Sequence, residues 1–283
     1  MGRIQNAVKA LLGVNPPIKR ELYAIPKMVE SEKKLDGKIA LIIGATGGIG
    51  KELAETFIKN GSKVILAARD LNKLNALASN LQEKYGEVCR SCKIDVTDID
   101  SMGNAFENVL SLFEEKRIDI LVNASGVNTQ TRFWDFKEDE FDRILDINLK
   151  GVFFACQYVA NYMRKNGIKG HILNVSSASA LRPAWTPYEI SKWSINGFTR
   201  GLADLCLPYG IIVNAIAPGP VATEMLGKSE ADNLINENNV SGRYAVPSEI
   251  AELATYMVSD FGNLIVGETF YITGGSGLIT LHR

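Results

Sequence analysis

The chain has 283 residues, of which 46% are hydrophobic and 22% are charged, and its formal net charge is −1. This is an ordinary globular composition, and it excludes the strongly basic surface that would hold nucleic acid. The longest apolar runs, such as Ile39–Ile43, are far too short to cross a bilayer, and the N-terminal residues lack the features of a signal peptide. We therefore expect no nucleic-acid or membrane partner and a cytoplasmic location.

Four cysteines and two histidines are too few for a disulfide scaffold or an obvious metal site, and they favour a reducing compartment. Cys89 and Cys92 form a C-x-x-C pair, but no second pair completes a tetrahedral zinc site. The pair lies in an expected strand, where side chains three positions apart point to opposite faces. We therefore expect no metal and no redox role for these cysteines.

Residues 1–36 differ in pattern from the rest of the chain. Ile4, Val8 and Leu11 recur at helical spacing before Gly13, which can end a helix. We expect a short amphipathic helix and then an extended arm. Packing on its own domain or on a neighbouring subunit is favoured over binding to a membrane surface, because the apolar face is small.

Apolar, β-rich runs alternate with helical segments throughout residues 37–283, with no linker or repeat between them. This alternation predicts crossover connections, and hence a parallel sheet covered by helices on both faces. We expect an α/β fold, a Rossmann-type doubly wound parallel sheet in a single domain with a short N-terminal extension. The expected strands are Ile39–Ile43, Lys63–Ala67, Val88–Ile94, Ile118–Asn123, His171–Ser176, Ile211–Ala217 and Thr269–Thr273. The expected helices span residues 48–60, 71–85, 101–116, 138–165, 187–207 and 247–259.

A glycine-rich turn, Gly44-Ala45-Thr46-Gly47-Gly48-Ile49-Gly50, joins the first expected strand to the first expected helix. Glycines allow a tight turn and let backbone N–H groups approach a pyrophosphate at the helix N-terminus. Such a turn alone is a weak signal, but its position between a strand and a helix makes it good evidence for a dinucleotide site.

The second expected strand ends about twenty residues past this turn, where the residue that selects between NAD and NADP belongs. A carboxylate at this position would bind the 2′-hydroxyl of NAD and repel the 2′-phosphate of NADP. Here Arg69 follows the strand instead, and its guanidinium can pair with a phosphate. Asp70 is a complication, because it could weaken this preference. We favour NADP(H), with NAD(H) possible; the alternative is an ordinary surface arginine that starts a helix.

The segment Thr186-Pro187-Tyr188-Glu189 predicts a helix start with a capping box. Tyr188 then lies in the first turn, and Lys192 follows one turn later on the same face. A tyrosine pKa of about 10 is too high for a base near neutrality, but an ammonium and the positive helix end both favour the phenolate. We therefore expect a lowered Tyr188 pKa and a general acid/base role for the pair, although this spacing alone is common on ordinary helices.

The strand before this helix ends in Ser176-Ser177, at the edge of the sheet where the cofactor crevice is expected. A hydroxyl there could donate a hydrogen bond to a reacting carbonyl. Only ten residues separate Ser177 from Tyr188, which leaves Ser176 and Ser179 as alternatives. We choose Ser177.

Together, these motifs resemble the short-chain dehydrogenase/reductase family, in its compact single-domain branch, from about Leu35 to Leu278. The catalytic positions match at Asn148, Ser177, Tyr188 and Lys192. Gly274-Gly275 matches the glycine pair after the last strand, and the segment Asn123-Ala124-Ser125-Gly126 matches its motif only at the first and last positions. The resemblance assigns cofactor binding to Gly44, Thr46, Gly47, Gly48, Ile49, Gly50, Arg69, Asp95, Val96, Asn123, Ala124, Gly126, Tyr188, Lys192, Pro218, Gly219, Val221 and Thr223.

The resemblance implies an enzyme that transfers hydride reversibly between NADP(H) and a small alcohol or carbonyl substrate. In reduction, Ser177 would hold the substrate oxygen and Tyr188 would donate the proton. Lys192 would lower the Tyr188 pKa and bind the nicotinamide ribose, and Asn148 would hold a water that passes the proton onward. The alternatives are a catalytically inactive NADP(H)-sensing protein and a 3-oxoacyl-thioester reductase instead of a sugar or ketoacid reductase.

The resemblance also implies a homo-oligomer, a dimer or a tetramer, because helices matching 138–165 and 187–207 usually form its dimer interface. Val152, Phe153, Phe154 and Tyr158 give the first of these helices more apolar surface than one buried face easily accommodates.

Two segments are expected to border the substrate. Thr223–Ala245 has few apolar anchors, so we expect a lid that is mobile without ligand. The short loop Ala178–Trp185 carries Arg182 and Trp185, which could bind an anionic group and pack on the carbon skeleton of a substrate. The alternative for Arg182 is an ordinary surface ion pair.

Overall fold

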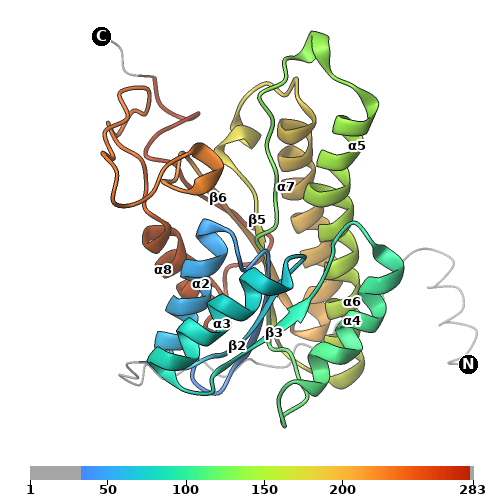
Figure 1. The fold of residues 1–283 in the computed structure, drawn as a ribbon. Helices are drawn as coiled ribbons and strands as arrows, with labels where there is room; N and C mark the ends of the chain where they lie inside the picture. Colours follow the sequence, from blue (N-terminus) through green and yellow to red (C-terminus); the bar gives the residue numbers. More distant parts are fainter. Residues whose placement is uncertain (1–32, 281–283) are drawn as a thin grey trace, which may run out of the picture. The chain divides into compact units, whose positions relative to one another are not determined.

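The structure is a computed structural model that describes residues 33–280 (Figure 1). The helix and most of the arm expected in residues 1–36 lie outside the described residues. Leu35 already belongs to the folded unit, because its side chain is fully buried and its N–H donates to the Asn60 carbonyl at 2.8 Å. Within residues 33–280, no helix has the length and apolar character to cross a membrane.

Seven parallel strands form one sheet in the order β3-β2-β1-β4-β5-β6-β7. The chain winds outward from β1 to β3, returns to β4 and then winds outward in the other direction, so the expected doubly wound sheet is confirmed. All strand bounds agree with expectation to within two residues. The strands are β1 (Ile39–Ile43), β2 (Lys63–Ala68), β3 (Cys89–Lys93), β4 (Ile120–Asn123), β5 (His171–Val175), β6 (Ile212–Pro218) and β7 (Thr269–Ile272).

Helices cover both faces of the sheet, as Figure 1 shows. Alternate residues of β1 point to opposite faces: Ile39 and Leu41 pack in one apolar cluster, and Ala40 and Ile42 pack in the other. The first cluster lies under α4 (Ile99–Ser111), α6 (Gly151–Asn166) and α7 (Pro187–Cys206), and the second lies under α2 (Gly48–Lys59), α3 (Leu71–Tyr85) and α8 (Pro247–Met257).

The C-x-x-C pair follows the same alternation. Cys89 lies in the cluster under α3, and Cys92 lies in the cluster under α4. Both thiols are free and buried. The two cysteines therefore point to opposite faces of the sheet, as expected.

Two expected helices differ from the structure. The helix expected at 138–165 is interrupted, because α5 (Glu138–Leu145) is joined to α6 by a π turn at Asp146–Lys150. A π turn inserts one residue per turn, which apolar periodicity does not reveal. Helix α4 (expected at 101–116) begins at Ile99, because Asp98 caps it by accepting from the Ser101 N–H at 3.0 Å, and it ends at Ser111, five residues before the expected end.

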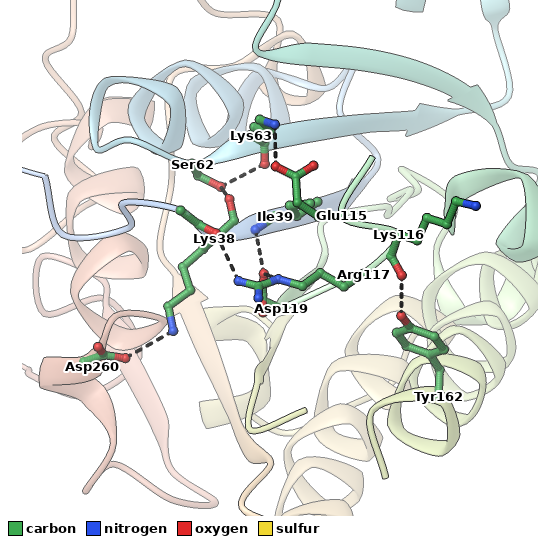
Figure 2. Close-up of polar contacts among 11 residues, drawn as sticks. Lys38, Ile39, Ser62, Lys63, Glu115, Lys116, Arg117, Asp119, Tyr162 and Asp260 are labelled. Carbon is green, nitrogen blue, oxygen red and sulfur yellow. Dashed lines mark hydrogen bonds and ion pairs between the residues drawn. The ribbon is translucent and has the colours of Figure 1, made fainter. Parts of the chain in front are cut away.

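At the amino ends of the strands, polar side chains form a network that is drawn in Figure 2. Its centre is Asp119, which is buried and accepts from the Ile39 N–H at 2.8 Å and from the Arg117 side chain at 3.0 Å. Arg117 also donates to the Gly37 carbonyl at 3.1 Å. We call this the amino-end network; its other contacts are the ion pairs Lys38–Asp260 and Lys63–Glu115 and the bonds from Ser62 to the Lys38 carbonyl and from Tyr162 to the Lys116 carbonyl.

Candidate active site

The glycine-rich turn Gly44–Gly50 joins β1 to α2, and Gly44, Gly48 and Gly50 have no room for a side chain. A Cβ on Gly48 would lie 2.6 Å from Thr223 Cγ2, and a Cβ on Gly50 would overlap the carbonyl oxygen of Gly44. Gly44 also has a φ of +89°, which L side chains rarely adopt. Close backbone packing therefore requires these glycines.

The first turn of α2 presents unoccupied backbone donors. Its N-cap residue, Gly47, has no side chain to accept from the first N–H groups, and the first turn contains no acidic residue. These N–H groups and the positive end of the helix suit an anion. The turn and the helix start therefore fit the pyrophosphate of a dinucleotide.

Arg69 follows the carboxyl end of β2 and is exposed. The adjacent Asp70 caps α3 by accepting from the Lys73 N–H at 3.1 Å, so its carboxylate is engaged with the helix. Among residues 33–280, no acidic side chain forms an ion pair with Arg69. The register of β2 with β3 also places the exposed Lys93 beside Ala68. We did not expect Lys93 here, because the sequence does not show which strands are neighbours.

A pocket of about 230 Å³ lies at the carboxyl ends of β4, β5 and β6. It brings together residues that are far apart in the sequence. Of the expected site residues, those that line it are Ile49, Ala124, Gly126, Ser177, Tyr188, Lys192, Pro218, Gly219, Val221 and Thr223. The lining residues that we did not assign to the site are Ser125, Asn128, Val175, Ala178, Pro220, Met225, Leu226 and Ser276, together with Arg182 and the alternatives Ser176 and Ser179.

The hydrogen bonds distinguish between the three candidate serines. Ser177 accepts from the Ser179 N–H at 3.1 Å and forms a side-chain hydrogen bond with Tyr188. The hydroxyl of Ser176 instead donates to the backbone carbonyl of Lys192 at 3.2 Å, which ties it to α7. The geometry therefore places Ser177 beside the expected acid/base.

Tyr188 lies at the start of α7, where the expected capping box is present: Thr186 accepts from the Glu189 N–H, and Glu189 accepts from the Thr186 N–H. Our expectation of a lowered Tyr188 pKa is wrong for the chain by itself. Burial raises this pKa above 10.0, and the hydrogen bond with Ser177 opposes the rise without cancelling it. Tyr188 is therefore a phenol, a proton donor, at neutral pH.

Lys192 is buried, and its ammonium donates to the Val175 carbonyl at 2.8 Å. Its Nζ lies 5.7 Å from the centre of the Tyr188 ring. Burial lowers the Lys192 pKa from 10.5 to about 8. The ammonium therefore still predominates at pH 7, on the ring face of the phenol.

Asn148 lies in the π turn between α5 and α6 and is fully buried. Its side-chain oxygen accepts from the Val127 N–H at 2.8 Å, and its side-chain nitrogen donates to the Val127 carbonyl at 2.9 Å and to Ser191 at 3.3 Å. The amide is therefore engaged in fixing the loop after β4. Gly126, in this loop, packs between the Asn148 side chain and the Lys192 ammonium, because a Cβ on Gly126 would lie 3.6 Å from each.

Not every expected cofactor residue lines the pocket. The Asn123 side chain is buried and donates to Asn174 at 2.9 Å and to Cys156 at 3.2 Å, so it stabilises the strands below the site. Asp95 accepts from the N–H and the hydroxyl of the nearby Thr97, and Val96 is buried. The others outside the pocket are Gly44, Thr46, Gly47, Gly48, Gly50 and Arg69.

The comparisons with known proteins agree with this geometry. A family model described as short chain dehydrogenase matches residues 38–234. The oxidoreductase UcpA of Salmonella typhimurium is 35% identical over 263 residues, which cover 87% of this chain and 96% of that protein. The chain belongs to the short-chain dehydrogenase/reductase family.

Two further members of this family show how far the likeness extends. The 3-oxoacyl-[acyl-carrier-protein] reductase FabG of Aquifex aeolicus is 31% identical, over 86% of this chain and 99% of that protein. A gluconate 5-dehydrogenase from Burkholderia cenocepacia, solved in complex with NADP and tartrate, has a TM-score of 0.80 and 26% identity over 88% of this chain and 99% of that one. The short-chain dehydrogenase/reductase described here is therefore an oxidoreductase that acts on CH–OH or keto groups with a nicotinamide cofactor.

Proposed function

We propose that this enzyme reduces a small ketone, or oxidises the corresponding secondary alcohol, with NADP(H) in preference to NAD(H). The observation that carries the proposal is the convergence of Ser177, Tyr188 and Lys192 in one pocket beside the glycine-rich turn. The bound nicotinamide would supply or accept the hydride. The chain supplies position, hydrogen bonds and a proton.

Each of the three residues has a role that its contacts support. The Ser177 hydroxyl would orient the substrate oxygen, and the Tyr188 phenol would donate a proton to it. Lys192, held by the Val175 carbonyl, keeps a positive charge near the phenolate that forms when Tyr188 gives up its proton. The raised pKa of Tyr188 favours reduction at neutral pH, and alcohol oxidation should accelerate as the pH rises because it needs the phenolate.

We also propose that Asn148 belongs to the proton relay, although its side-chain amide already has other hydrogen-bond partners. Its side-chain amide is engaged with Val127 and Ser191, so this amide positions the loop that carries Gly126. A water held at Asn148 would have to bind another of its atoms. Its location in a π turn is consistent with a functional position, because π turns are frequent at such sites.

The preference for NADP(H) rests on charge at the carboxyl ends of β2 and β3. Arg69 and Lys93 are exposed there, and the carboxylate of the adjacent Asp70 is engaged in capping α3. Two cations suit a 2′-phosphate better than a ribose hydroxyl. The NADP in the gluconate 5-dehydrogenase complex is consistent with this preference.

One experiment tests the proposed function most directly. Purified protein is supplied with NADPH or NADH and a panel of ketoacids, sugars, polyols, steroids and acyl thioesters, and cofactor oxidation is followed by absorbance. We expect turnover of at least one carbonyl with NADPH. Binding of NADPH without turnover of any panel member would favour the alternative, an inactive NADP(H)-sensing protein.

A 3-oxoacyl-thioester reductase is the second candidate, because the FabG relative is named as one and is 31% identical. The sugar or ketoacid reading is supported by the gluconate 5-dehydrogenase, which was solved with tartrate. The same panel distinguishes them by comparing kcat/KM for acetoacetyl thioesters with kcat/KM for ketoacids.

We also propose that the enzyme is a homo-oligomer, a dimer or a tetramer, in the cytoplasm. Phe153, Phe198 and Leu205 line an apolar groove of about 530 Å³ between α6 and α7, and Leu205 is 70% exposed. Val152, Phe154 and Tyr158, which we expected to add to this surface, instead pack on the core of their own domain. Light scattering at micromolar concentration tests the assembly, and a monomer would contradict it.

The four free cysteines are consistent with a reducing compartment.

The lid stays a proposal as well. Met225 and Leu226, at the start of Thr223–Ala245, line the pocket and are half exposed, so their closure over a substrate would bury apolar surface. Hydrogen exchange should show fast exchange of this segment without ligand and slower exchange with NADPH and substrate. Equal protection in both states would contradict the lid.

A further inference from the structure

The charged side chains that line the active-site pocket are all positive. Its lining contains two ionic side chains, Arg182 and Lys192, and no aspartate or glutamate. The Lys192 ammonium is buried beside Tyr188 and donates to the Val175 carbonyl. Arg182 is therefore the cation that remains for an incoming substrate.

Arg182 is held in place from two sides. Its backbone carbonyl accepts from the Trp193 indole N–H at 2.8 Å, and its guanidinium donates through Nη2 to the Ser276 hydroxyl at 2.6 Å. Ser276 also lines the pocket. The loop Ala178–Leu181, a single 3-10 turn that begins directly after Ser177, brings Arg182 into the pocket wall.

The guanidinium keeps most of its donors free. Among residues 33–280, Arg182 forms no ion pair, so the ordinary surface ion pair that was the alternative reading is not present. A guanidinium has five N–H donors, of which this structure uses one. Trp185, which we expected to pack beside it on the substrate, is 57% exposed and does not line the pocket.

We propose that Arg182, positioned by Ser276, binds the carboxylate of a small oxo acid or hydroxy acid substrate. The inference rests on the proposed function, because it concerns the same pocket and the same reacting carbonyl. A planar carboxylate matches the fork of a guanidinium and can accept two parallel hydrogen bonds. Ser177 and Arg182 line the same pocket of about 230 Å³, so one small molecule can place its carbonyl at Ser177 and its carboxylate at Arg182.

The test uses two probes that differ in charge but share a reacting ketone, acetoacetate and its neutral methyl ester. The readout is the ratio of kcat/KM for the acid to kcat/KM for the ester, measured with NADPH for the wild type, for Arg182→Gln and for Arg182→Lys. We expect Arg182→Gln to lower this ratio about 10- to 100-fold, as loss of a charge-assisted hydrogen bond does. Arg182→Lys should recover part of it, and Ser276→Ala should lower it by less than Arg182→Gln.

A binding measurement removes the dependence on turnover. Malonate is titrated by calorimetry into the wild type and into Arg182→Gln, each with NADP⁺ present, and we expect the affinity to fall about 10-fold or more in the variant. The matched control is Arg143→Gln, because Arg143 is exposed on α5 and does not line the pocket. This control should leave both the ratio and the malonate affinity unchanged.

The failures of the two proposals give different results. An unchanged ratio in Arg182→Gln, or malonate binding that does not depend on Arg182, overturns the carboxylate site while ketone reduction persists. Malonate binding that depends on Arg182, without hydride transfer to any carbonyl, overturns the proposed function and leaves the anion site standing. If Arg182→Gln instead impairs dihydroxyacetone phosphate relative to dihydroxyacetone and spares the acetoacetate ratio, the anion is a phosphate and the carboxylate assignment is wrong.

Discussion

At the amino ends of the strands, Asp119 accepts from Ile39 and Arg117, and Lys38 pairs with Asp260, so these polar groups satisfy one another. At the carboxyl ends, the first N–H groups of α2 have no side-chain cap, and Arg69 and Arg182 form no ion pair among residues 33–280. Both edges belong to the same sheet and both carry charged side chains. The polar groups of the amino-end network (Figure 2) are paired with one another, whereas the carboxyl edge has N–H donors that can bind a ligand.

The difference has a physical cause in the parallel sheet. Helices that follow the strands begin at the carboxyl edge, so their positive ends and free N–H groups gather there. Ligands of such sheets bind at this edge for the same reason. Changes at the carboxyl edge should therefore reduce activity and leave the fold intact, and changes at the amino edge should do the opposite.

Tyr188→Phe should have the largest effect. The ring packing survives and only the acid/base hydroxyl is lost, so turnover should fall by about 10²- to 10⁴-fold, with NADPH affinity and the unfolding midpoint close to wild type. Steady-state rates, cofactor titration and urea unfolding measure the three quantities.

The matched control is Tyr256→Phe, because Tyr256 lies on α8 outside the pocket and is 45% exposed. Ser177→Ala should be comparable to Tyr188→Phe, and Ser176→Ala should be milder. Turnover of Tyr188→Phe within a few-fold of wild type would refute the acid/base assignment.

Lowering the pH should decrease the free energy of unfolding through His171, which lies at the amino edge of the sheet. Burial, and secondarily the charge of Lys38, lower the His171 pKa from 6.5 to about 4, against the opposing effects of Asp260 and Asn263. Between these pH values His171 is protonated in the unfolded chain and neutral in the folded chain. The free energy of unfolding therefore falls as the pH drops from about 6.5 to about 4. The full loss from this group is about 3 kcal/mol.

Urea unfolding of the wild type and of His171→Asn at several pH values between 4 and 7 measures this loss. The variant is compared by its slope against pH, because its stability at pH 7 can differ for other reasons. Carboxylates contribute a slope in both proteins, so the difference between the slopes isolates His171. Identical slopes would contradict the assignment.

Asp119→Ala should destabilise the fold by about 2 kcal/mol, because it leaves the buried Ile39 N–H without its acceptor. Urea unfolding measures the effect, and kcat per folded molecule should be unchanged. Asp142→Ala, at an exposed position on α5, should leave both unchanged. A variant as stable as wild type would show that the amino-end network adds no stability.

Arg69→Asp should have the narrowest effect, because it acts on cofactor choice alone. We expect NADPH affinity to fall about 10- to 100-fold and NADH affinity to stay within a few-fold, because the new carboxylate repels the 2′-phosphate. Fluorescence titration of both cofactors measures this. Wild-type protein that binds the two cofactors equally, or binds NADH more tightly, would contradict the proposed preference for NADP(H).

The sequence by itself determined the features that depend on neighbouring residues. Alternation of apolar runs predicted the strands, and the capping box at Thr186 and Glu189 predicted the start of α7 with Tyr188 and Lys192 on one face. These features are local, because capping and side-chain periodicity act over one or two turns. The family resemblance and the glycine-rich turn followed from the same short-range patterns.

The tertiary structure alone decided what depends on burial and on distant partners. Burial raised the Tyr188 pKa, although the local pattern indicated a lowered one, and packing turned Asn123 toward Asn174. The π turn that carries Asn148 leaves no mark in the periodicity. Arg182 is held by Ser276, 94 residues further along the chain, because the carboxyl ends of β5 and β7 lie at the same edge of the sheet, on either side of β6. No local pattern encodes this arrangement.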